Sequence, residues 1–356
     1  MVDNRASNRK NYDIGISWWS RWDEIGNSIA TTLKDMGHNV LTFPYGKKLP
    51  EVDIVLTYGP FGSLTPITNQ LAAISLHERP MFILWLTEQF PNPNLPEWLR
   101  YSASTLRIEL ERAGYISENG AEWQIRPGAN WILSKGSRFR YYGELHWLRK
   151  AGILTILVTP SQWTANFLRQ KNFDPVVACI RFELCGNSDL GIKRDIPVLW
   201  LGKTGSKRRE RLLRQVRSEL SAQGIEMMVI DGVENPSIFG EERTKLLNRT
   251  KIALNLLREP WDDNSLRFFF AAENHVLIVS EPSLPHSPFL PGTHVVEVPV
   301  EQITDTICYY LSNDKERQKI TESAYQLVTN ELTLENSLSK ILKRVEDIHT
   351  ETELVT

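Results

Sequence analysis

The sequence has few cysteines and no long apolar run, and each shortage argues against a class of protein. Its three cysteines, Cys179, Cys185 and Cys308, have neither metal-site nor redox spacing, which argues against a disulfide scaffold. No stretch approaches the ~18 to 20 apolar residues of a membrane-spanning helix. The opening residues MVDNRASNRKNYD contain no signal-peptide core. We therefore expect a cytoplasmic protein with reduced thiols.

Net charge is also nearly absent. The 41 Lys and Arg residues are balanced by 43 Asp and Glu, so no overall field favours nucleic acid or an anionic membrane, and we expect no nucleic-acid partner. Hydrophobic residues make up 41% and charged residues 24% of the chain, the balance of a soluble globular protein. At 356 residues, the chain is long enough for two domains.

Strands and helices alternate in the first half. An amphipathic helix over 23–37 can end at Gly37 in a left-handed cap. The strands read as continuous apolar runs, which is typical of a parallel sheet covered by helices on both faces. The expected strands cover 12–17, 38–43, 52–58, 80–86, 152–159 and 175–182. A polar and aromatic insertion over 91–149 interrupts this order and is expected to be helical.

The same pattern begins again after a polar linker at 185–195. Strands are expected over 196–202, 225–231, 250–257, 275–281 and 294–299, followed by a helical tail. The sequence thus predicts an α/β protein with two Rossmann-like, doubly wound domains, 1–186 and 187–356. Such sheets bind ligands at the carboxyl ends of their strands, so the site is expected in a central cleft, with hinges at the linker and the last helix.

Two phosphate-binding motifs are missing. The GKT at 202–204 lacks the earlier glycine of a nucleoside triphosphatase loop, because Pro197 stands at that position. No strand is followed by G-x-G-x-x-G, so a dinucleotide site is not supported. The basic loop after residue 201 therefore needs another explanation.

A family resemblance supplies one. VLWLGKTGSKRRERLL, LLNRTKIALNLL, LRFFFAAENHVLIVSE, PGTHVVEVP and TLENSLSKIL occur in the order found in the C-terminal domain of GT-B glycosyltransferases. Residues 196–348 resemble that domain, especially in the spore-maturation-protein-like group, whereas residues 1–185 resemble the family only in the general alternation of strands and helices. The resemblance implies sugar transfer from a nucleoside diphosphate donor, without a cofactor or a metal.

The basic loop fits such a donor. The resemblance assigns phosphate contacts to a basic residue after Gly202 and to another five positions later, and these are Lys203 and Arg208. Lys207 opens the next helix, where a helix N-terminus also favours anions. The simpler interpretation is a solvated basic helix face, but its position at the end of a strand favours the phosphate site.

The helix over 265–273 departs from the family. Alignment keeps Arg267 as a donor contact but places the two expected carboxylates at Asp262 and Phe270. Glu273 lies one turn beyond Phe270 and could substitute for the missing carboxylate. The alternative is a surface glutamate. Glu273 and Glu281 are separated by seven residues, as the two glutamates of many retaining members of the fold are, but the alignment does not place that pair at these positions.

Acceptor residues are expected in the first domain. Trp18, Trp19 and Trp22 follow the first strand, where flat aromatic faces could pack on a sugar, although helix-start packing explains any one of them. Gly59 and Gly62 follow another strand and either allow backbone to approach a ligand or form a tight turn.

Two side chains could act as the general base. Glu88 comes directly after a strand, although a helix-cap role is the simpler explanation. His146 lies in a locally basic helix that could meet an anionic acceptor or a lipid surface. A structural histidine on a solvated basic helix is the alternative.

The sequence therefore predicts transfer to a hydroxyl of a glycan, lipid-linked or small-molecule acceptor. No metal site is expected, because the adjacent acidic residues of WDD, 261–263, lack a convincing third ligand. A second interpretation is a GT-B-like protein that binds a nucleotide sugar, or a protein partner, without turnover, which Phe270 favours. A third is a nucleotide-sugar epimerase, which the identity of the product sugar would distinguish from a transferase.

Overall fold

The computed structural model describes residues 10–18, 23–59, 64–88, 90–113, 116–119, 122–125, 137–181, 189–262 and 265–353. The chain forms two compact units. The first combines the chain up to Thr159 with Leu168–Ala178 and the chain from Leu338 onward, and the second contains Pro160–Phe167 and Cys179–Ser337. The C-terminal residues therefore belong to the first unit and not to the second.

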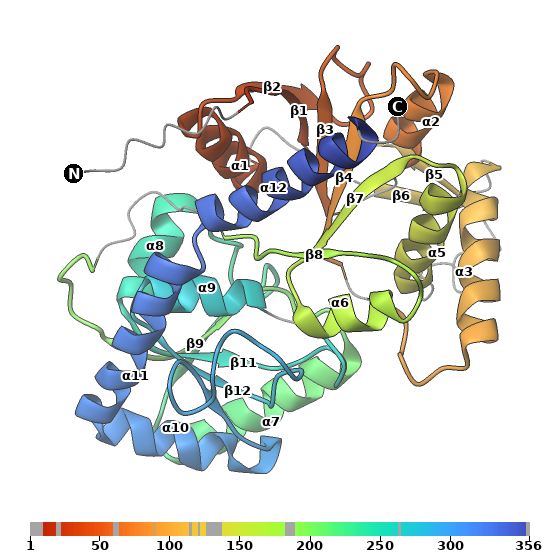
Figure 1. Ribbon diagram of the computed structural model, residues 1–356. Coiled ribbons are helices and arrows are strands. Elements are labelled where there is room, and N and C mark those ends of the chain that lie inside the picture. Colours follow the sequence, from red (N-terminus) through yellow and green to blue (C-terminus); the bar gives the residue numbers. More distant parts are fainter. Residues whose placement is uncertain are drawn as a thin grey trace, which may run out of the picture. The chain divides into compact units, whose positions relative to one another are not determined.

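The first unit is built on a six-stranded, wholly parallel sheet in the order β2-β1-β3-β4-β7-β8 (Figure 1). Its strands are β1 (Asp13–Trp18), β2 (Asn39–Pro44), β3 (Ile54–Gly59), β4 (Met81–Leu86), β7 (Leu154–Thr159) and β8 (Val176–Val177). Its helices are α1 (Glu24–Asp35), α2 (Thr65–Ala73), α3 (Glu97–Arg112), α5 (Ser137–Lys150) and most of α12 (Leu334–Glu353).

The second unit has a five-stranded parallel sheet in the order β10-β9-β11-β12-β13. Its strands are β9 (Ile196–Leu201), β10 (Met227–Ile230), β11 (Thr250–Asn255), β12 (Leu277–Ser280) and β13 (Val296–Glu297). Its helices are α6 (Gln162–Arg169), most of which lies in this unit, α7 (Lys207–Ala222), α8 (Gly240–Asn248), α9 (Ser265–Glu273), α10 (Ile303–Ser312) and α11 (Asp314–Gln326), with short 3-10 and π-helical turns at Val300–Gln302 and Leu327–Glu331.

Apolar residues on both faces explain why the sheets are covered by helices. Alternate residues of β9 enter two separate clusters, because successive side chains of a strand point to opposite faces. Leu199 packs with residues of α9, whereas Val198 and Trp200 pack with residues of α7 and α10. The predicted α/β class with two Rossmann-like, doubly wound sheets is confirmed.

Local capping signals set the limits of α1. The Asp23 side chain accepts a hydrogen bond from the Gly26 backbone N–H at 3.0 Å and caps the N-terminus. Gly37 has φ +95°, so the predicted left-handed end of this helix is confirmed.

The insertion over 91–149 contains more than helices. Between α3 and α5 the chain forms an antiparallel hairpin, β5 (Ile116–Asn119) with β6 (Glu122–Ile125), which the sequence did not predict. A two-stranded ribbon this short has too few apolar positions to show a clear period in the sequence. The strand expected at 175–182 is also reduced to the two residues of β8.

Helix α3 has an inverted pattern of polarity. Its charged side chains Arg107 and Glu111 are 5% and 7% exposed and form an ion pair of 3.0 Å, whereas Trp98 and Leu106 are exposed. Arg140 of α5 approaches the same Glu111 carboxylate at 3.8 Å. Buried charges require partners of opposite sign, and here α3 and α5 supply them to each other.

Candidate functional site

The loop after β9 is shaped by two glycines that admit arginine side chains. Gly202 has φ +111°, and a Cβ atom there would lie 3.1 Å from Nη2 of Arg267. Gly205 has φ +67°, and its Cβ would lie 2.7 Å from Nε of Arg258. Any side chain at either position would strain the backbone and crowd a guanidinium. The two glycines thus hold two arginines against one short loop.

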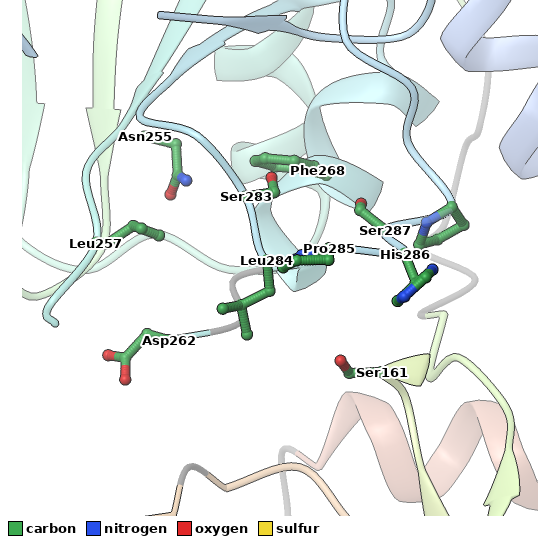
Figure 2. Close-up of a pocket in the computed structure, with 11 residues that line it drawn as sticks. Ser161, Asn255, Leu257, Asp262, Phe268, Ser283, Leu284, Pro285, His286 and Ser287 are labelled. Carbon is green, nitrogen blue, oxygen red and sulfur yellow. The ribbon is translucent and has the colours of Figure 1, made fainter. Parts of the chain in front are cut away.

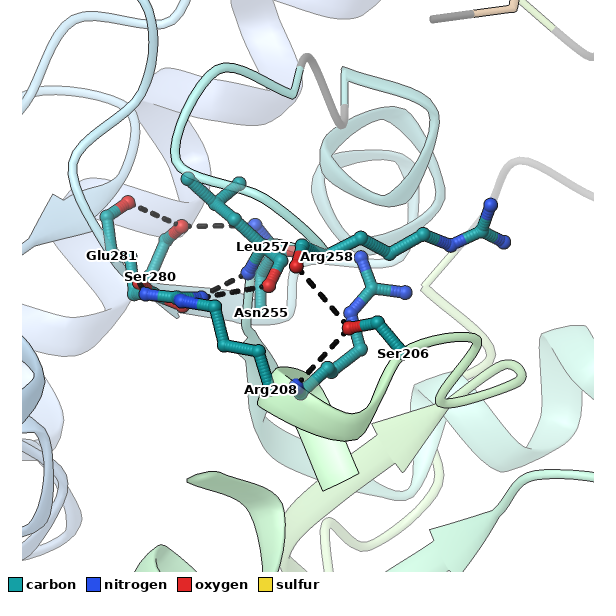
Figure 3. Close-up of polar contacts among 8 residues, drawn as sticks. Ser206, Arg208, Asn255, Leu257, Arg258, Ser280 and Glu281 are labelled. Atoms are coloured by element: carbon teal, nitrogen blue, oxygen red, sulfur yellow. Dashed lines mark hydrogen bonds and ion pairs between the residues drawn. The ribbon is translucent and has the colours of Figure 1, made fainter. Parts of the chain in front are cut away.

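The N-terminus of α7 opens onto this loop. Ser206 caps the helix by accepting a hydrogen bond from the Arg209 backbone N–H at 3.2 Å. The Ser206 hydroxyl donates to the Arg258 carbonyl at 3.2 Å (Figure 3), and the Arg209 guanidinium donates to the Lys203 carbonyl at 3.3 Å. A capped helix N-terminus adds a partial positive charge to the arginines around it.

Arg267 of α9 is the centre of this cluster. It donates to Oδ1 of Asn255 at 3.2 Å, and its guanidinium carbon lies 4.5 Å from the centre of the Trp200 ring. Burial, and then the charges of Arg209 and Arg258, lower the pKa of Arg267 to about 9. The charged neighbours that shift this pKa are therefore both cations, and a bound anion would relieve their repulsion.

A cavity of about 310 Å³ adjoins the cluster. Gly202, Lys203 and Arg267 line the end beside the loop after β9. The remaining walls come from β10, β11, α8, α9 and the segment before α8, and they are mostly apolar. Among them are Ile230, Ile238, Phe239, Leu247 and Ala253. An apolar cavity with a cationic end suits a ligand that has a flat ring at one end and phosphate at the other.

Phe270 faces this cavity from α9, one helical turn beyond Arg267. The guanidinium carbon of Arg243, from α8, lies 4.4 Å from the centre of its ring. The described residues that line the cavity include no aspartate and no glutamate. The position that the resemblance assigned to a carboxylate is thus an apolar wall.

A second, smaller hollow contains Asp262. It is lined by Asn255, Phe268 and Ser161 together with the segment 283–288, and the Asp262 side chain reaches its edge (Figure 2). Asp262 is only 2% exposed. Asn255 lines both hollows, so the hollow that contains Asp262 adjoins the cavity that Arg267 lines.

Arg208 is held away from the arginine cluster. Its guanidinium donates to both carboxylate oxygens of Glu281, at 3.1 and 2.5 Å, and to the Leu257 carbonyl at 2.8 Å. Figure 3 shows the Arg258 side chain extending away from this pair. Arg208 therefore has a carboxylate partner within its own unit, whereas Lys203 lines the cavity and Lys207 is exposed at the start of α7.

Glu273 does not reach the cavity. It is 0% exposed, and its Oε1 pairs with Nε of Arg181 at 2.6 Å. A buried carboxylate needs a cation, and Arg181, which is 92 residues earlier in the sequence, supplies it. The structure therefore does not place Glu273 where it could replace the carboxylate expected at position 270.

The residues expected on the acceptor side belong to the first unit. Trp18 ends β1 and Gly59 ends β3 with φ +108°, so both lie at the carboxyl edge of the sheet. Glu88 follows β4, and its charge, after burial, helps to raise the pKa of Tyr141 to about 12. Trp19, Trp22 and Gly62 lie outside the described residues.

His146 packs in an aromatic setting between α3 and α5. Its ring lies 5.0 Å from Tyr101 and 4.6 Å from Tyr142, centre to centre, and its Nδ1 is 3.4 Å from Arg149 Nη2. Burial, and then the charge of Arg149, lower the pKa of His146 to about 4. With this pKa, His146 is neutral at ordinary pH. It also lines a separate hollow of about 280 Å³ between these helices.

Three arginines that the sequence reasoning missed contribute to the site: Arg209, Arg243 and Arg258. Arg258 follows β11 closely, so the rule that selected Lys203 at a strand end would also have found it. Arg209 was one of several basic residues at the start of α7, and only its burial separates it from the exposed ones. Arg243 had no local signal.

Within the described ranges, no group of three or more His, Cys, Asp or Glu side chains is arranged to hold a metal ion. In the same ranges, no helix is both long and apolar enough to span a membrane. Positive charge at the site comes from arginine, lysine and the N-terminus of α7.

Comparison with known proteins identifies the fold. Residues 208–343 match the family model described as "Glycosyl transferase-like". Anabaena HepE, solved in complex with UDP and glucose, is 9% identical with a TM-score of 0.55, and the match covers 96% of this chain and 100% of that one. An α-glucosyltransferase solved with UDP and DNA is 9% identical with a TM-score of 0.50, covering 94% and 99%.

A point mutant of S. aureus TarM, solved with fondaparinux, α-GlcNAc-glycerol and UDP, is 11% identical with a TM-score of 0.54. The match covers 82% of this chain and 55% of TarM, so the chain spans about half the length of that structure. Curated protein sequences include no significant match to the chain. The chain thus has the GT-B fold of glycosyltransferases, and most of its second unit matches the glycosyl transferase-like family.

Proposed function

We propose that the protein is a glycosyltransferase that moves a sugar from a nucleoside diphosphate donor to a hydroxyl acceptor. The observation that carries this proposal is the cluster of Arg209, Arg258 and Arg267 around the loop after β9, beside a cavity with apolar walls. The diphosphate would lie against the cluster and the nucleoside in the cavity. Nucleoside diphosphates in the solved structures of the same fold are further support.

The cluster would act on the leaving group. When the acceptor oxygen bonds to the anomeric carbon, the bond from that carbon to the phosphate oxygen breaks and negative charge collects on the diphosphate. Arg258, Arg267, Lys203 and the N-terminus of α7 are positioned to stabilise that charge, and they do so without a metal ion. Fixed cations of this kind act without reorganising during the reaction.

The remaining roles follow from position. Asp262 is proposed to bind hydroxyls of the donor sugar, because its hollow shares the lining residue Asn255 with the cavity beside Arg267. Glu88, with Trp18 and Gly59 at the carboxyl edge of the first sheet, is proposed to receive the acceptor proton. The acceptor is proposed to be a glycan, a lipid-linked sugar or a small molecule, and the compartment the cytoplasm.

A second function is donor binding without transfer. It is favoured by the pairing of Glu273 with Arg181, which withdraws one of the two candidate carboxylates of the second unit from the cavity. In that case the arginine cluster would sense a nucleotide sugar and no glycosidic bond would form.

One experiment separates these functions. Purified protein is mixed with a panel of nucleoside diphosphate sugars, with and without cell extract as acceptor source, and both thermal shift and release of nucleoside diphosphate are followed. Transfer predicts a shift and a release, both lost in Arg267→Met and kept in the surface control Arg249→Met. A shift without release supports the sensor, and no shift with any donor contradicts both.

A further inference from the structure

Phe270 lies where the pentose of a bound nucleotide would be placed. Arg267 and Phe270 are three residues apart on α9, so their side chains lie on the same face, about 5 to 6 Å apart at Cβ. In a nucleoside diphosphate, the pentose follows the phosphates directly. A donor whose diphosphate meets Arg267 would therefore bring its pentose to Phe270.

A ribose needs acceptors at this place. Its 2′- and 3′-hydroxyls form a pair of donors, and in nucleotide sites of α/β folds an acidic side chain usually accepts from them. The described lining of the cavity contains no Asp or Glu, and the wall next to Arg267 is a phenyl ring. The polar acceptors that also line the cavity, Ser237 and Asn255, come from other elements, and the ring itself gives a 2′-hydroxyl no replacement for its hydrogen bond to water.

Arg243 keeps the ring in this place. Its guanidinium lies over the Phe270 ring at 4.4 Å, where the cation is attracted by the aromatic face. The guanidinium donates and cannot accept, so it offers nothing to a hydroxyl hydrogen. The Phe270 ring, which Arg243 holds in place, thus forms a wall without an acceptor and favours a pentose with hydrogen at the 2′ position.

The rest of the cavity, where the base would lie, is mostly apolar, with Ser237 and Arg243 as its polar side chains. Ile230, Ile238, Phe239, Leu247 and Ala253 line it. A methyl group on the base would be buried against such side chains, which is favourable for each apolar group removed from water.

From these observations we infer that the donor is a 2′-deoxynucleoside diphosphate sugar with a methylated pyrimidine base, that is, of the deoxythymidine diphosphate class. The inference rests on the proposed function, since it assigns the ligand of the same site. It makes Phe270 the residue that selects deoxyribose over ribose.

Three diphosphates test the inference by isothermal titration calorimetry with the full chain. UDP and 2′-deoxyuridine diphosphate differ only in the 2′-hydroxyl, and 2′-deoxyuridine and deoxythymidine diphosphates differ only in the base methyl. We expect the deoxyuridine form to bind ~10-fold more tightly than UDP, and the methyl group to add a further ~3-fold.

Phe270→Glu should reverse the first preference, because the new carboxylate can accept from a ribose diol while Arg243 balances its charge. Phe270→Leu is the matched control and should keep the preference for the deoxy form. UDP binding as tightly as its deoxy form to the unaltered protein would overturn the inference and leave the proposed function intact. If none of the three diphosphates binds but GDP does, the inference is overturned and the proposed function stands, and if GDP does not bind either, both fail. The unaltered protein decides the question even if the glutamate variant does not fold.

Discussion

Each unit contains a cluster of arginines, and the two clusters differ in the charges that surround them. In the first unit, Arg107 and Arg140 both face Glu111, at 3.0 and 3.8 Å. In the second unit, the charges that act on Arg267 belong to Arg209 and Arg258. The first cluster balances its charge internally and joins two helices, whereas the second has an excess of positive charge beside a cavity. The sign of the neighbouring charges, rather than the number of arginines, separates the structural cluster from the candidate binding site.

Removing the carboxylate from the first cluster should have the largest effect. Glu111→Gln leaves two buried guanidiniums without their shared counter-charge, and we expect the free energy of unfolding to fall by about 3 to 5 kcal/mol. Urea denaturation followed by tryptophan fluorescence measures this loss. Affinity for a nucleoside diphosphate, measured where the variant is folded, should not change, and an unaltered unfolding curve would contradict the structural role.

Removing the central cation from the second cluster should affect binding instead. Arg267→Met keeps most of the side-chain volume and removes the charge, so we expect affinity for nucleoside diphosphate to fall ~100-fold, equivalent to ~2.7 kcal/mol. Arg249→Met is the matched control, since Arg249 pairs with Asp195 on the surface at 2.8 Å. Titration calorimetry should find the control within twofold of the unaltered protein. Equal affinities for both variants would remove Arg267 from the site.

The stability of the protein should also depend on pH through Glu144, a second carboxyl group beside the first cluster. Burial raises the pKa of Glu144, next to Arg140 and Glu111, to about 8. Between the ordinary glutamate pKa of about 4.5 and this raised value, the folded state holds a proton that the unfolded state has lost. The contribution of Glu144 to stability is therefore fully present below about pH 4.5 and is lost as pH rises through about 8. Between pH 6 and 8 the loss from this group is about 2 kcal/mol.

Glu144→Gln should flatten that part of the pH dependence and stabilise the protein above pH 8. Denaturation at a series of pH values provides the measurement. His146 gives the opposite slope at lower pH, because its pKa is lowered to about 4 and the folded state resists protonation. A variant with the same slope as the unaltered protein between pH 6 and 8 would exclude Glu144 as its source.

The smallest effects should come from the glycines. Gly202→Ala strains a backbone with φ +111° and places its Cβ 3.1 Å from the Arg267 guanidinium, so we expect a loss of about 1 kcal/mol in stability and ~5-fold in affinity. Gly224→Ala is the control, with φ +73° and open space around its Cβ. It should lose similar stability and no affinity. If both variants bind equally well, Gly202 does not shape the site.

Much of the fold could be predicted because the strands are apolar on both faces and several helices carry clear end signals such as Asp23 and Gly37. The hairpin of β5 and β6 could not, since four-residue strands show no period. Within the site, the family resemblance identified Lys203, Arg267 and the unusual Phe270, and the position of Lys203 at a strand end supported its assignment. The partners of Arg208 and Glu273 could not be predicted, because Glu281 and Arg181 are 73 and 92 residues away in sequence.

The return of the C-terminal residues to the first unit affects how the protein is made. Tyr12 of the first unit stacks on His349 of α12 at 5.8 Å, and Asp174 approaches Arg344 of the same helix at 3.7 Å. During synthesis, most of α12 is translated only after the whole second unit. The final packing of the first unit is therefore delayed until the second unit has been made, although its own sheet leaves the ribosome before that of the second unit.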